Sequence, residues 1–337
     1  METAHNIRLT VTEVGLLWTT YVNDTMARCV LTYFLNKVED TEIKPVIEYA
    51  LKITNIQIKA LTALFHSENF PIPIGFTDED VNASAPRLFT DHLILEYVKN
   101  MSKVGLPICS MAFTMTSRSD VRAFYADCIS QIQTLDQQST GVLQSKGLYI
   151  RPPFITIPKK VDFVDKQSFL SGRFLGFGDK RPLIAMEISS LSANIMTNAL
   201  GKALMIGFSQ VAKSQEIRQY LVRGKEISSK HIKVFSDQLV DEDIPSPMTW
   251  DSDVTNSTVP PFSDKLMLSH VAMLVTAGTG NYAMAAAASP RADITSTFVR
   301  LAAEIAIYAK DGAKLTIENG WLEEPPQAPN REELAGV

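Results

Sequence analysis

The amino-acid sequence predicts an all-α protein built from two tandem four-helix bundles. Three observations lead to this prediction. A unit of roughly 165 residues occurs twice in the chain, which is the signature of a repeated architecture. Each copy contains four long segments in which apolar residues recur at helical spacing. The second of the three connections between these segments is the long one in both copies, and this order of connection lengths predicts how the helices pack.

Turn and cap residues at a constant offset define the repeat. Arg118 and Asp120 recur 173 residues later as Arg291 and Asp293. The same offset relates Gly147 to Gly320, Pro152-Pro153 to Pro325-Pro326, Asp78-Glu79-Asp80-Val81 to Asp251-Ser252-Asp253-Val254, and Phe89 to Phe262. Further upstream the offset is 174, and it aligns Glu13, Leu17, Phe34 and Pro73 with Glu187, Leu191, Phe208 and Pro247. Because most of these residues specify turns and helix ends, we expect the two halves to share one fold.

The predicted helices follow the same plan in both halves. In the first half they run from Glu13 to Val38, from Glu42 to Ser67, from Asp91 to before Ser119, and onward through Asp120 to Leu143. In the second half they run from Glu187 to Ala212, from Gln215 to Leu239, from Asp264 to before Ser289, and onward through Asp293 to Leu315. Thr90 and Ser263 precede the third helix of each half, where a hydroxyl can accept a hydrogen bond from a free helix N–H group.

The lengths of the connections predict the topology of each bundle. Short turns join the first helix to the second and the third to the fourth, so the helices of each pair are antiparallel. The middle connection spans about 20 residues and is marked by prolines, Pro71 and Pro73 or Pro245 and Pro247. A connection of this length can cross the whole bundle, and one long crossover is the ferritin-like arrangement.

These elements divide the chain into four parts. We expect the first bundle to cover residues 1–153 and the second to cover residues 184–326, each ending at a Pro-Pro pair. The linker between them, residues 154–183, is predicted to pack on a bundle because it is rich in aromatic residues: Phe163, Phe169, Phe174 and Phe177. The polar tail, residues 327–337, is expected to be loose.

Composition limits the classes of partner and the cellular compartment that we expect for this chain. Charged residues make up 20% of the 337 residues, the formal net charge is −5, and no segment collects Lys and Arg, so we expect no nucleic-acid partner. Cys29, Cys109 and Cys128 fit a reducing cytoplasm better than a secreted disulfide framework. The polar N-terminus predicts no signal peptide. The apolar stretch 266–288 is rich in Ala and Gly and contains His270, which favours a buried bundle helix over a membrane span.

A linked set of motifs resembles a known family. Ser263-Asp264-Lys265-Leu266, Arg291-x-Asp293 and Asn319-Gly320-Trp321-Leu322-Glu323-Glu324-Pro325-Pro326 follow one another in the second half, and the linker contains Lys166-Gln167-Ser168-Phe169 and Lys180-Arg181-Pro182-Leu183. They resemble an uncharacterised family of duplicated proteins from spore-forming Bacillus-type bacteria, catalogued as domain of unknown function 3231. The resemblance covers nearly the whole chain. It implies two ferritin-like bundles and a distant likeness to a small spore-coat protein, and it implies no established activity.

The candidate chemistry is a metal site in the second half. Ferritin-like enzymes hold two metal ions with carboxylates and Glu-x-x-His pairs, but the only such pair here is Glu2 with His5 at the chain end, so no standard di-iron site is expected. Four polar residues instead lie on predicted core faces of the second half: Asn198, His231, His270 and Glu304. In an antiparallel helix pair, residues equally far from the connecting turn lie at the same height. This places His270 opposite Glu304 and His231 level with Asn198. If these two levels coincide, the group could bind one Fe, Mn or Zn ion.

Other interpretations stay open at the level of sequence. A buried histidine that faces a glutamate is often only a satisfied polar pair. The equivalent residues of the first half are Asp24, Gln57, Tyr97 and Gln131, so a metal site would belong to the second half alone. The alternative function is a non-catalytic structural or interaction protein, spore-associated and assembling into a homo-oligomer. A third hypothesis is a small apolar ligand held beside Gly278 and Gly280. No catalytic residue is assigned.

Overall fold

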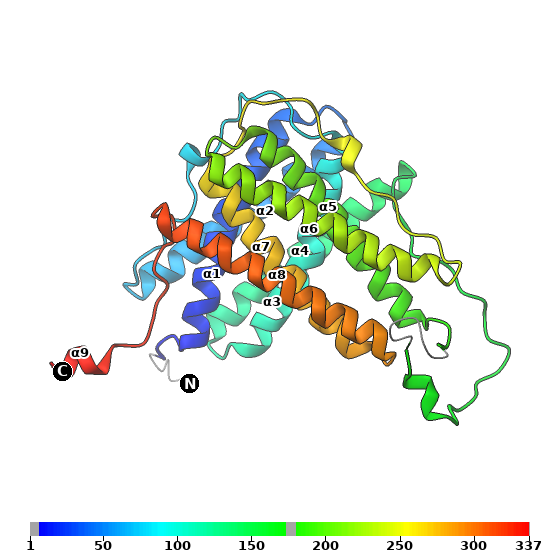
Figure 1. Cartoon of the computed structure of the whole chain (residues 1–337). Coiled ribbons are helices and arrows are strands. Elements are labelled where there is room, and N and C mark those ends of the chain that lie inside the picture. The colour runs from blue at the N-terminus through cyan, green and yellow to red at the C-terminus, as the bar shows by residue number, and fades with distance from the viewer. Residues whose placement is uncertain (1–6, 173–179, 337) are drawn as a thin grey trace.

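The structure is a computed structural model that describes residues 7–172 and 180–336. Its long elements are helices, as the sequence predicts, and their ends lie within a few residues of the predicted ends. In the first half the helices are α1 (Val11–Lys37), α2 (Lys44–Ser67), α3 (Asp91–Met115) and α4 (Ser119–Ser145). In the second half they are α5 (Ala185–Val211), α6 (Gln215–Val240), α7 (Asp264–Ala288) and α8 (Ala292–Glu318). The chain therefore consists of two tandem helical bundles (Figure 1).

Each half is a four-helix bundle with one long crossover. α1 packs on α2 and α3 on α4, and the second half repeats this pairing with α5 on α6 and α7 on α8. Asp91 at the start of α3 accepts hydrogen bonds from the backbone N–H groups of Glu39 and Asp40, in the turn that leads into α2. Asp264 at the start of α7 binds the turn between α5 and α6 in the same way. The third helix of each half thus starts at the end of the bundle where the second helix starts.

A buried glutamate at an equivalent position of each half ties two helix ends together. Glu13, in the first turn of α1, accepts hydrogen bonds from the backbone N–H groups of Thr10 (2.8 Å) and Arg118 (2.9 Å). Glu187, in the first turn of α5, accepts from the backbone N–H of Arg291 (3.1 Å). Since unpaired N–H groups at a helix start attract negative charge, each glutamate joins the start of the first helix to the start of the fourth.

The two halves meet through reciprocal contacts at the crossovers, which lie side by side at the top of Figure 1. Thr90 of the first half donates a hydrogen bond to Asp253 Oδ1 of the second half (2.7 Å). Its equivalent, Ser263, donates to Asp80 Oδ1 of the first half (2.7 Å). Two isolated antiparallel bridges show the same exchange: Val81 with Phe262, and Phe89 with Val254. An interface in which each contact recurs with the partners exchanged has an approximate twofold axis.

The largest cluster of buried apolar side chains extends across both halves, and we call it the joint core. It contains the crossover aromatics, among them Phe89 of the first half, which packs edge-on against Phe208 of the second half at 6.2 Å between ring centroids. Each half also has a smaller core at its far end, around Phe65 in the first half and Phe235 in the second. The bundles are therefore fused at one end by hydrophobic burial and separate at the other.

The linker departs from the packing that its aromatic residues predict. Phe163 is 95% exposed, and Figure 1 shows the green segment before α5 as a long loop that stands away from the helices. Phe169 has a contact, with its ring centroid 4.2 Å from the Arg181 guanidinium carbon; Phe174 and Phe177 lie outside the described residues. Without a helix to direct them to one side, aromatic side chains of a linker do not share a face, so composition alone predicted too much packing.

Two further segments were singled out in the sequence: the apolar stretch 266–288 and the C-terminal tail. Within the described residues, α7 is the helix that is long and apolar enough to cross a membrane. Leu266, Met267 and His270 in its first half are buried in the protein, but only 17% of the apolar stretch of α7 is buried, which is less than the sequence predicts for a buried bundle helix. The tail contains a short exposed helix, α9 (Arg331–Ala335), which stands away from the bundles in Figure 1.

Candidate functional site

Three of the four predicted metal ligands come together in the second bundle, around a tyrosine that the sequence did not single out. His231 on α6 is fully buried, and its Nε2 lies 3.4 Å from Glu304 Oε2. Its Nδ1 shares a hydrogen bond with the Tyr282 hydroxyl (2.9 Å). Asn198 Nδ2 donates to the same hydroxyl (2.7 Å). Tyr282 of α7 thus connects His231 to Asn198, while Glu304 contacts the other ring nitrogen of His231.

The fourth residue, His270, lies elsewhere. It is fully buried, and its Nε2 is hydrogen-bonded to the hydroxyl of Tyr97 from the first half (2.7 Å). Along α7 it is twelve residues before Tyr282, which corresponds to about 18 Å. The two levels therefore do not coincide, and His270 serves the contact between the halves. Burial lowers the pKa of His270 to about 4, so the imidazole is neutral at neutral pH.

The group around His231 offers a metal ion few ligands. In residues 7–172 and 180–336, no cluster of three or more His, Cys, Asp or Glu side chains has a geometry suited to a metal ion. Both carboxylate oxygens of Glu304 accept hydrogen bonds from Lys230 Nζ at 2.8 Å. Burial lowers the pKa of His231 and favours the neutral ring that a metal requires, but an ion bound there would have to compete with Lys230 for the carboxylate.

The first bundle has an uncharged version of the same pair. Gln57 and Gln131 occupy the positions equivalent to His231 and Glu304, and Gln57 Nε2 donates to Gln131 Oε1 (3.0 Å). A polar pair at this level is therefore common to both halves. Beside it in the first half lies a feature that the sequence analysis did not predict, a cavity that is partly open to solvent.

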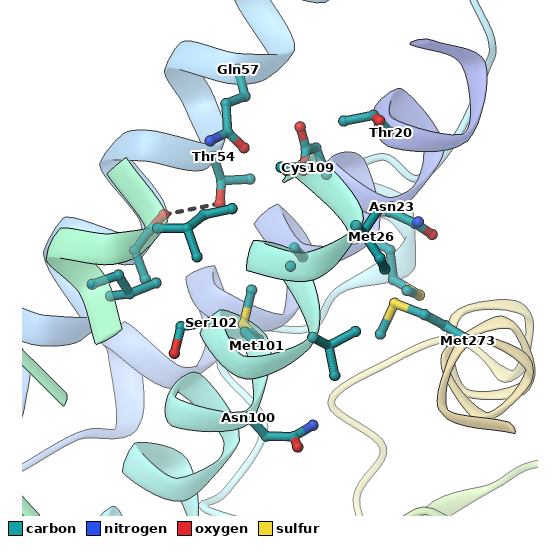
Figure 2. Close-up of a pocket in the computed structure, with 18 of the residues that line it drawn as sticks. Thr20, Asn23, Met26, Thr54, Gln57, Asn100, Met101, Ser102, Cys109 and Met273 are labelled. Carbon is teal, nitrogen blue, oxygen red and sulfur yellow. Dashed lines mark hydrogen bonds between the residues drawn. The ribbon is translucent and has the colours of Figure 1, made fainter. Parts of the chain in front are cut away.

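The cavity has a volume of about 150 Å³ and lies among α1, α2, α3 and α4, with α7 of the second half closing one side. Its wall is mostly apolar, with hydroxyl and amide groups distributed around it. Figure 2 labels part of the lining: Thr20, Asn23, Met26, Thr54, Gln57, Asn100, Met101, Ser102, Cys109 and Met273. In that view Met273 approaches from α7, so the second half contributes to a cavity of the first.

Asp24 supplies a carboxyl group to this cavity. Its Oδ2 is shielded from solvent and has no hydrogen-bond partner in the described part of the chain. Burial, reinforced by the nearby Cys109 thiol, raises the pKa of Asp24 well above its usual value, because a low-dielectric surrounding disfavours the charged form. A buried polar atom without a partner costs free energy, and a ligand that supplies a hydrogen-bond donor would remove that cost.

The second bundle has a cavity at the equivalent place, but it is smaller, with a volume of about 50 Å³. Tyr282 stands there at the position of Cys109, and Tyr308 at the position of Leu135. The two larger side chains occupy space that is open in the first bundle. Gly278, predicted from the sequence to border a ligand gap, lines this smaller cavity. Of these two equivalent cavities, the larger therefore lies in the first half, which has no counterpart of His231 or His270.

The repeat itself contains a signal for the cavity. Comparison of the two halves at the 173-residue offset pairs Cys109 with Tyr282 and Leu135 with Tyr308. Both substitutions remove an aromatic ring from the first half. Since protein interiors are close-packed, two losses of volume at one level of a bundle indicate a void there.

Comparison with known proteins gives one family and one fold neighbour. A family model described as "Protein of unknown function (DUF3231)" matches residues 1–161 and 173–334. No curated protein matches the chain. A solved structure from Bacillus halodurans C-125, provisionally described as a spore coat protein, is similar to 45% of this chain and is covered over 98% of its own length, with 20% sequence identity and a TM-score of 0.41.

Proposed function

Because the chain belongs through both of its halves to the DUF3231 family of proteins of unknown function, and that description assigns no activity, we propose a function from the geometry of its cavity. The protein binds a small amphipathic molecule inside the first bundle. The observation that carries this proposal is a cavity of about 150 Å³ lined by Asp24, whose Oδ2 is shielded from solvent and has no hydrogen-bond partner among the described residues.

The size and lining of the cavity define the ligand. An apolar cavity of about 150 Å³ can hold a molecule the size of benzene. The apolar wall, which includes Met26, Met101 and Met273, would contact a hydrocarbon ring or short chain, and flexible methionines adapt to irregular ligands. Asp24 would accept a hydrogen bond from a donor group. We therefore expect a ligand with an apolar body and an amine or another donor.

The second bundle supplies a natural comparison. The equivalent position of Asp24 is Asn198, and there the Tyr282 hydroxyl satisfies the polar side chain from within the protein. In the first bundle no phenol is available at that position, because residue 109 is cysteine. The ligand would take the place that Tyr282 fills in the other half.

Titration of the full chain with three related probes tests the proposal. Toluene, benzyl alcohol and benzylamine share a ring and differ in the donor group, and isothermal titration calorimetry measures their affinities. We expect benzylamine to bind about tenfold or more tightly than toluene, since a hydrogen bond to a charged group contributes about 1.5–3 kcal/mol. The Asp24→Asn variant should bind benzylamine more weakly than the parent and bind toluene with the same affinity.

A cavity-filling variant tests the location. Cys109→Tyr copies Tyr282 of the second half and should abolish binding of all three probes. Met111→Tyr places the same side chain on the same helix at an exposed position (51% exposed) and should bind them like the parent chain. Absence of binding by every probe, or unchanged binding in a folded Cys109→Tyr variant, contradicts the proposal.

A metal ion at His231 and Glu304 is the second candidate, because the 3.4 Å contact between them brings an imidazole and a carboxylate together. Such an ion would be Fe, Mn or Zn. Asn198 lies on the opposite side of the imidazole, where it donates to the Tyr282 hydroxyl that is bonded to His231 Nδ1. Elemental analysis of protein purified without chelator tests it: one ion per chain is expected, with loss in His231→Ala and retention in His270→Ala. Protein without stoichiometric metal rules the site out.

A structural role, spore-associated and based on self-assembly, is the alternative to ligand binding. The words spore coat describe the Bacillus halodurans protein, and they enter here only as a hypothesis for this chain. Light scattering of the purified chain distinguishes the two: assembly predicts a discrete oligomer whose formation does not respond to Asp24→Asn or Cys109→Tyr.

A further inference from the structure

A second cleft lies between the two halves, outside the cavity described above. Its volume is about 320 Å³, and its walls come from α3, the segment that follows α4, and α5 of the second half. Trp250, Met196 and Leu200 form an apolar side of the cleft. Asn100 is common to the cleft and the cavity, so the two spaces are neighbours that open on different sides of α3.

A buried carboxyl group lines this cleft. Glu96 of α3 is only 6% exposed, and no donor of the described chain makes a hydrogen bond to it. The nearest basic nitrogen is His92 Nε2, at 3.8 Å, beyond hydrogen-bonding distance. Burial raises the pKa of Glu96 to about 7, although Lys99 and Lys103 on the same helix oppose the rise.

An ammonium group without a carboxylate partner lies on the same face of α3. Lys103 follows Glu96 by seven residues, which is two helical turns and about 10 Å. Its Nζ reaches Thr197 Oγ1 of the second half (3.3 Å), and no ion pair to it occurs in the described ranges. Lys99, between the two, is already paired with Asp136. In the described ranges the cleft therefore offers a buried carboxyl group with no Lys or Arg nitrogen within 4 Å, and an exposed ammonium group with no carboxylate within 4 Å.

The charged residues of the cleft occur in the first copy of the repeat and not in the second. The second-half equivalents of Glu96, Lys99, Lys103 and Asp136 are Ser269, Ala272, Thr276 and Ala309, all of them uncharged. The same helix pairing forms with neutral residues in α7 and α8, so bundle packing does not require the charges. Glu96 alone among them is buried. Burying a charge costs free energy, and a buried carboxyl group that the packing does not require is a candidate for binding.

We propose that this cleft binds a small ω-amino acid, a zwitterion whose two charges are separated by a short hydrocarbon chain, with its ammonium group at Glu96, its carboxylate at Lys103, and its apolar part against Trp250. Each unpaired charge of the cleft then meets an opposite charge of the ligand. The ligand itself is neutral overall, which matches a cleft whose charges sum to zero when Glu96 is ionised.

Three probes of one chain length test the proposal on the full chain: 6-aminohexanoate, hexanoate and hexylamine. Ligand-observed NMR or calorimetry should give an affinity for 6-aminohexanoate about tenfold or more above that for either singly charged probe, because two charge-assisted contacts replace one. Glu96→Ser and Lys103→Thr copy the residues of the second half, and each should reduce the affinity for 6-aminohexanoate by about tenfold or more.

Matched controls come from an exposed helix. Glu48→Ser and Lys52→Thr make the same exchanges on the outer face of α2 and should leave binding unchanged. Glu96→Gln keeps the shape of the side chain and removes its charge, so it serves if Glu96→Ser does not fold. The Cys109→Tyr variant, whose cavity is filled, should bind 6-aminohexanoate like the parent, which separates this proposal from the one for the cavity.

Three outcomes overturn the proposal. Equal affinities for the three probes would show that charge pairing does not contribute, and binding of hexanoate as tight as that of 6-aminohexanoate would make the cleft a simple anion site. Undiminished binding of 6-aminohexanoate by folded Lys103→Thr would also contradict it, since the carboxylate would then have no partner.

Discussion

Among single residues, Glu96 couples stability to pH most directly. Burial raises its pKa from 4.5 to about 7; Lys99 and Lys103 oppose the rise, and Asp253 adds to it. His92 also faces it, from one turn earlier on α3. A carboxyl whose folded pKa is raised stabilises the fold below its unfolded pKa, and this contribution is lost as the pH rises through the folded pKa. We therefore expect Glu96 to lower the free energy of unfolding by about 2–3 kcal/mol between about pH 5 and about pH 8.

Urea unfolding of Glu96→Gln at the two pH values measures this effect. The variant should gain stability over the parent at the higher pH and little at the lower one, because glutamine has no proton to lose. Glu48→Gln, on the exposed face of α2, should show no such dependence. A constant difference between Glu96→Gln and the parent at both pH values would mean that the carboxyl does not titrate in this range.

For single residues, the sequence predicted well which polar side chains face the cores, and it predicted less well which residues they contact. Asn198, His231 and Glu304 gather as part of one group, but His270 faces the first half instead. Hydrophobic burial has no direction, so the pattern that marks a helix face as buried does not say which neighbour covers it. The cavity was missed for a different reason: it arises from volume that is absent, and a search for functional groups finds only what is present.

At the scale of helices, the glutamate in the first turn of each half controls how two helix ends meet. Glu13 is buried, which raises its pKa, yet backbone hydrogen bonds from Thr10, Arg118 and Ser117 outweigh this and hold the pKa at about 2. Its stabilising contribution is therefore present above about pH 4.5 and is lost as the pH falls toward 2. We expect Glu13→Gln to cost about 1.5–3 kcal/mol at neutral pH, the usual contribution of hydrogen bonds to a charged group.

Acid titration of the two proteins checks this expectation. The parent should lose stability on acidification below about pH 4.5, and Glu13→Gln should lose less, so that the two unfolding curves approach each other. Glu48→Gln serves again as the exposed control. If Glu13→Gln is as stable as the parent at neutral pH, the contact between α1 and α4 does not depend on the charge.

The elements themselves were largely predictable, because their signals are local. Thr90 and Ser263 cap α3 and α7 as predicted, each accepting a hydrogen bond from the third residue after it. The long crossover followed from connection length. The linker was predicted wrongly at Phe163, since whether a segment without regular structure packs depends on distant surfaces that its own composition does not describe.

For the whole molecule, the reciprocal contacts predict a symmetric response to mutation. Asp80 and Asp253 each accept a hydroxyl hydrogen bond from the cap residue of the other half. Asp80→Ala and Asp253→Ala should therefore destabilise the chain by similar amounts, about 1–2 kcal/mol each. Because the joint core links the halves, unfolding should remain one transition in circular dichroism and in tryptophan fluorescence.

Urea unfolding of both variants followed by both signals provides the measurement. An exposed aspartate variant, Asp237→Ala on α6, controls for the loss of a carboxylate as such. Two separate transitions in the parent chain would show that the halves unfold independently. Strongly unequal effects of Asp80→Ala and Asp253→Ala would mean that the twofold relation does not extend to the energetics.

The contact between Tyr97 and His270 has a consequence for what duplication makes available. The two residues are equivalent in the repeat and meet at the approximate twofold axis. In a pair of identical chains, a position on the axis faces a copy of itself, and one codon determines both sides. In a chain that contains both copies, each side of the axis has its own codon and can change independently, so a phenol can lie opposite an imidazole. The centre of this molecule therefore holds a phenol–imidazole pair that no homodimer of either half could encode at the axis.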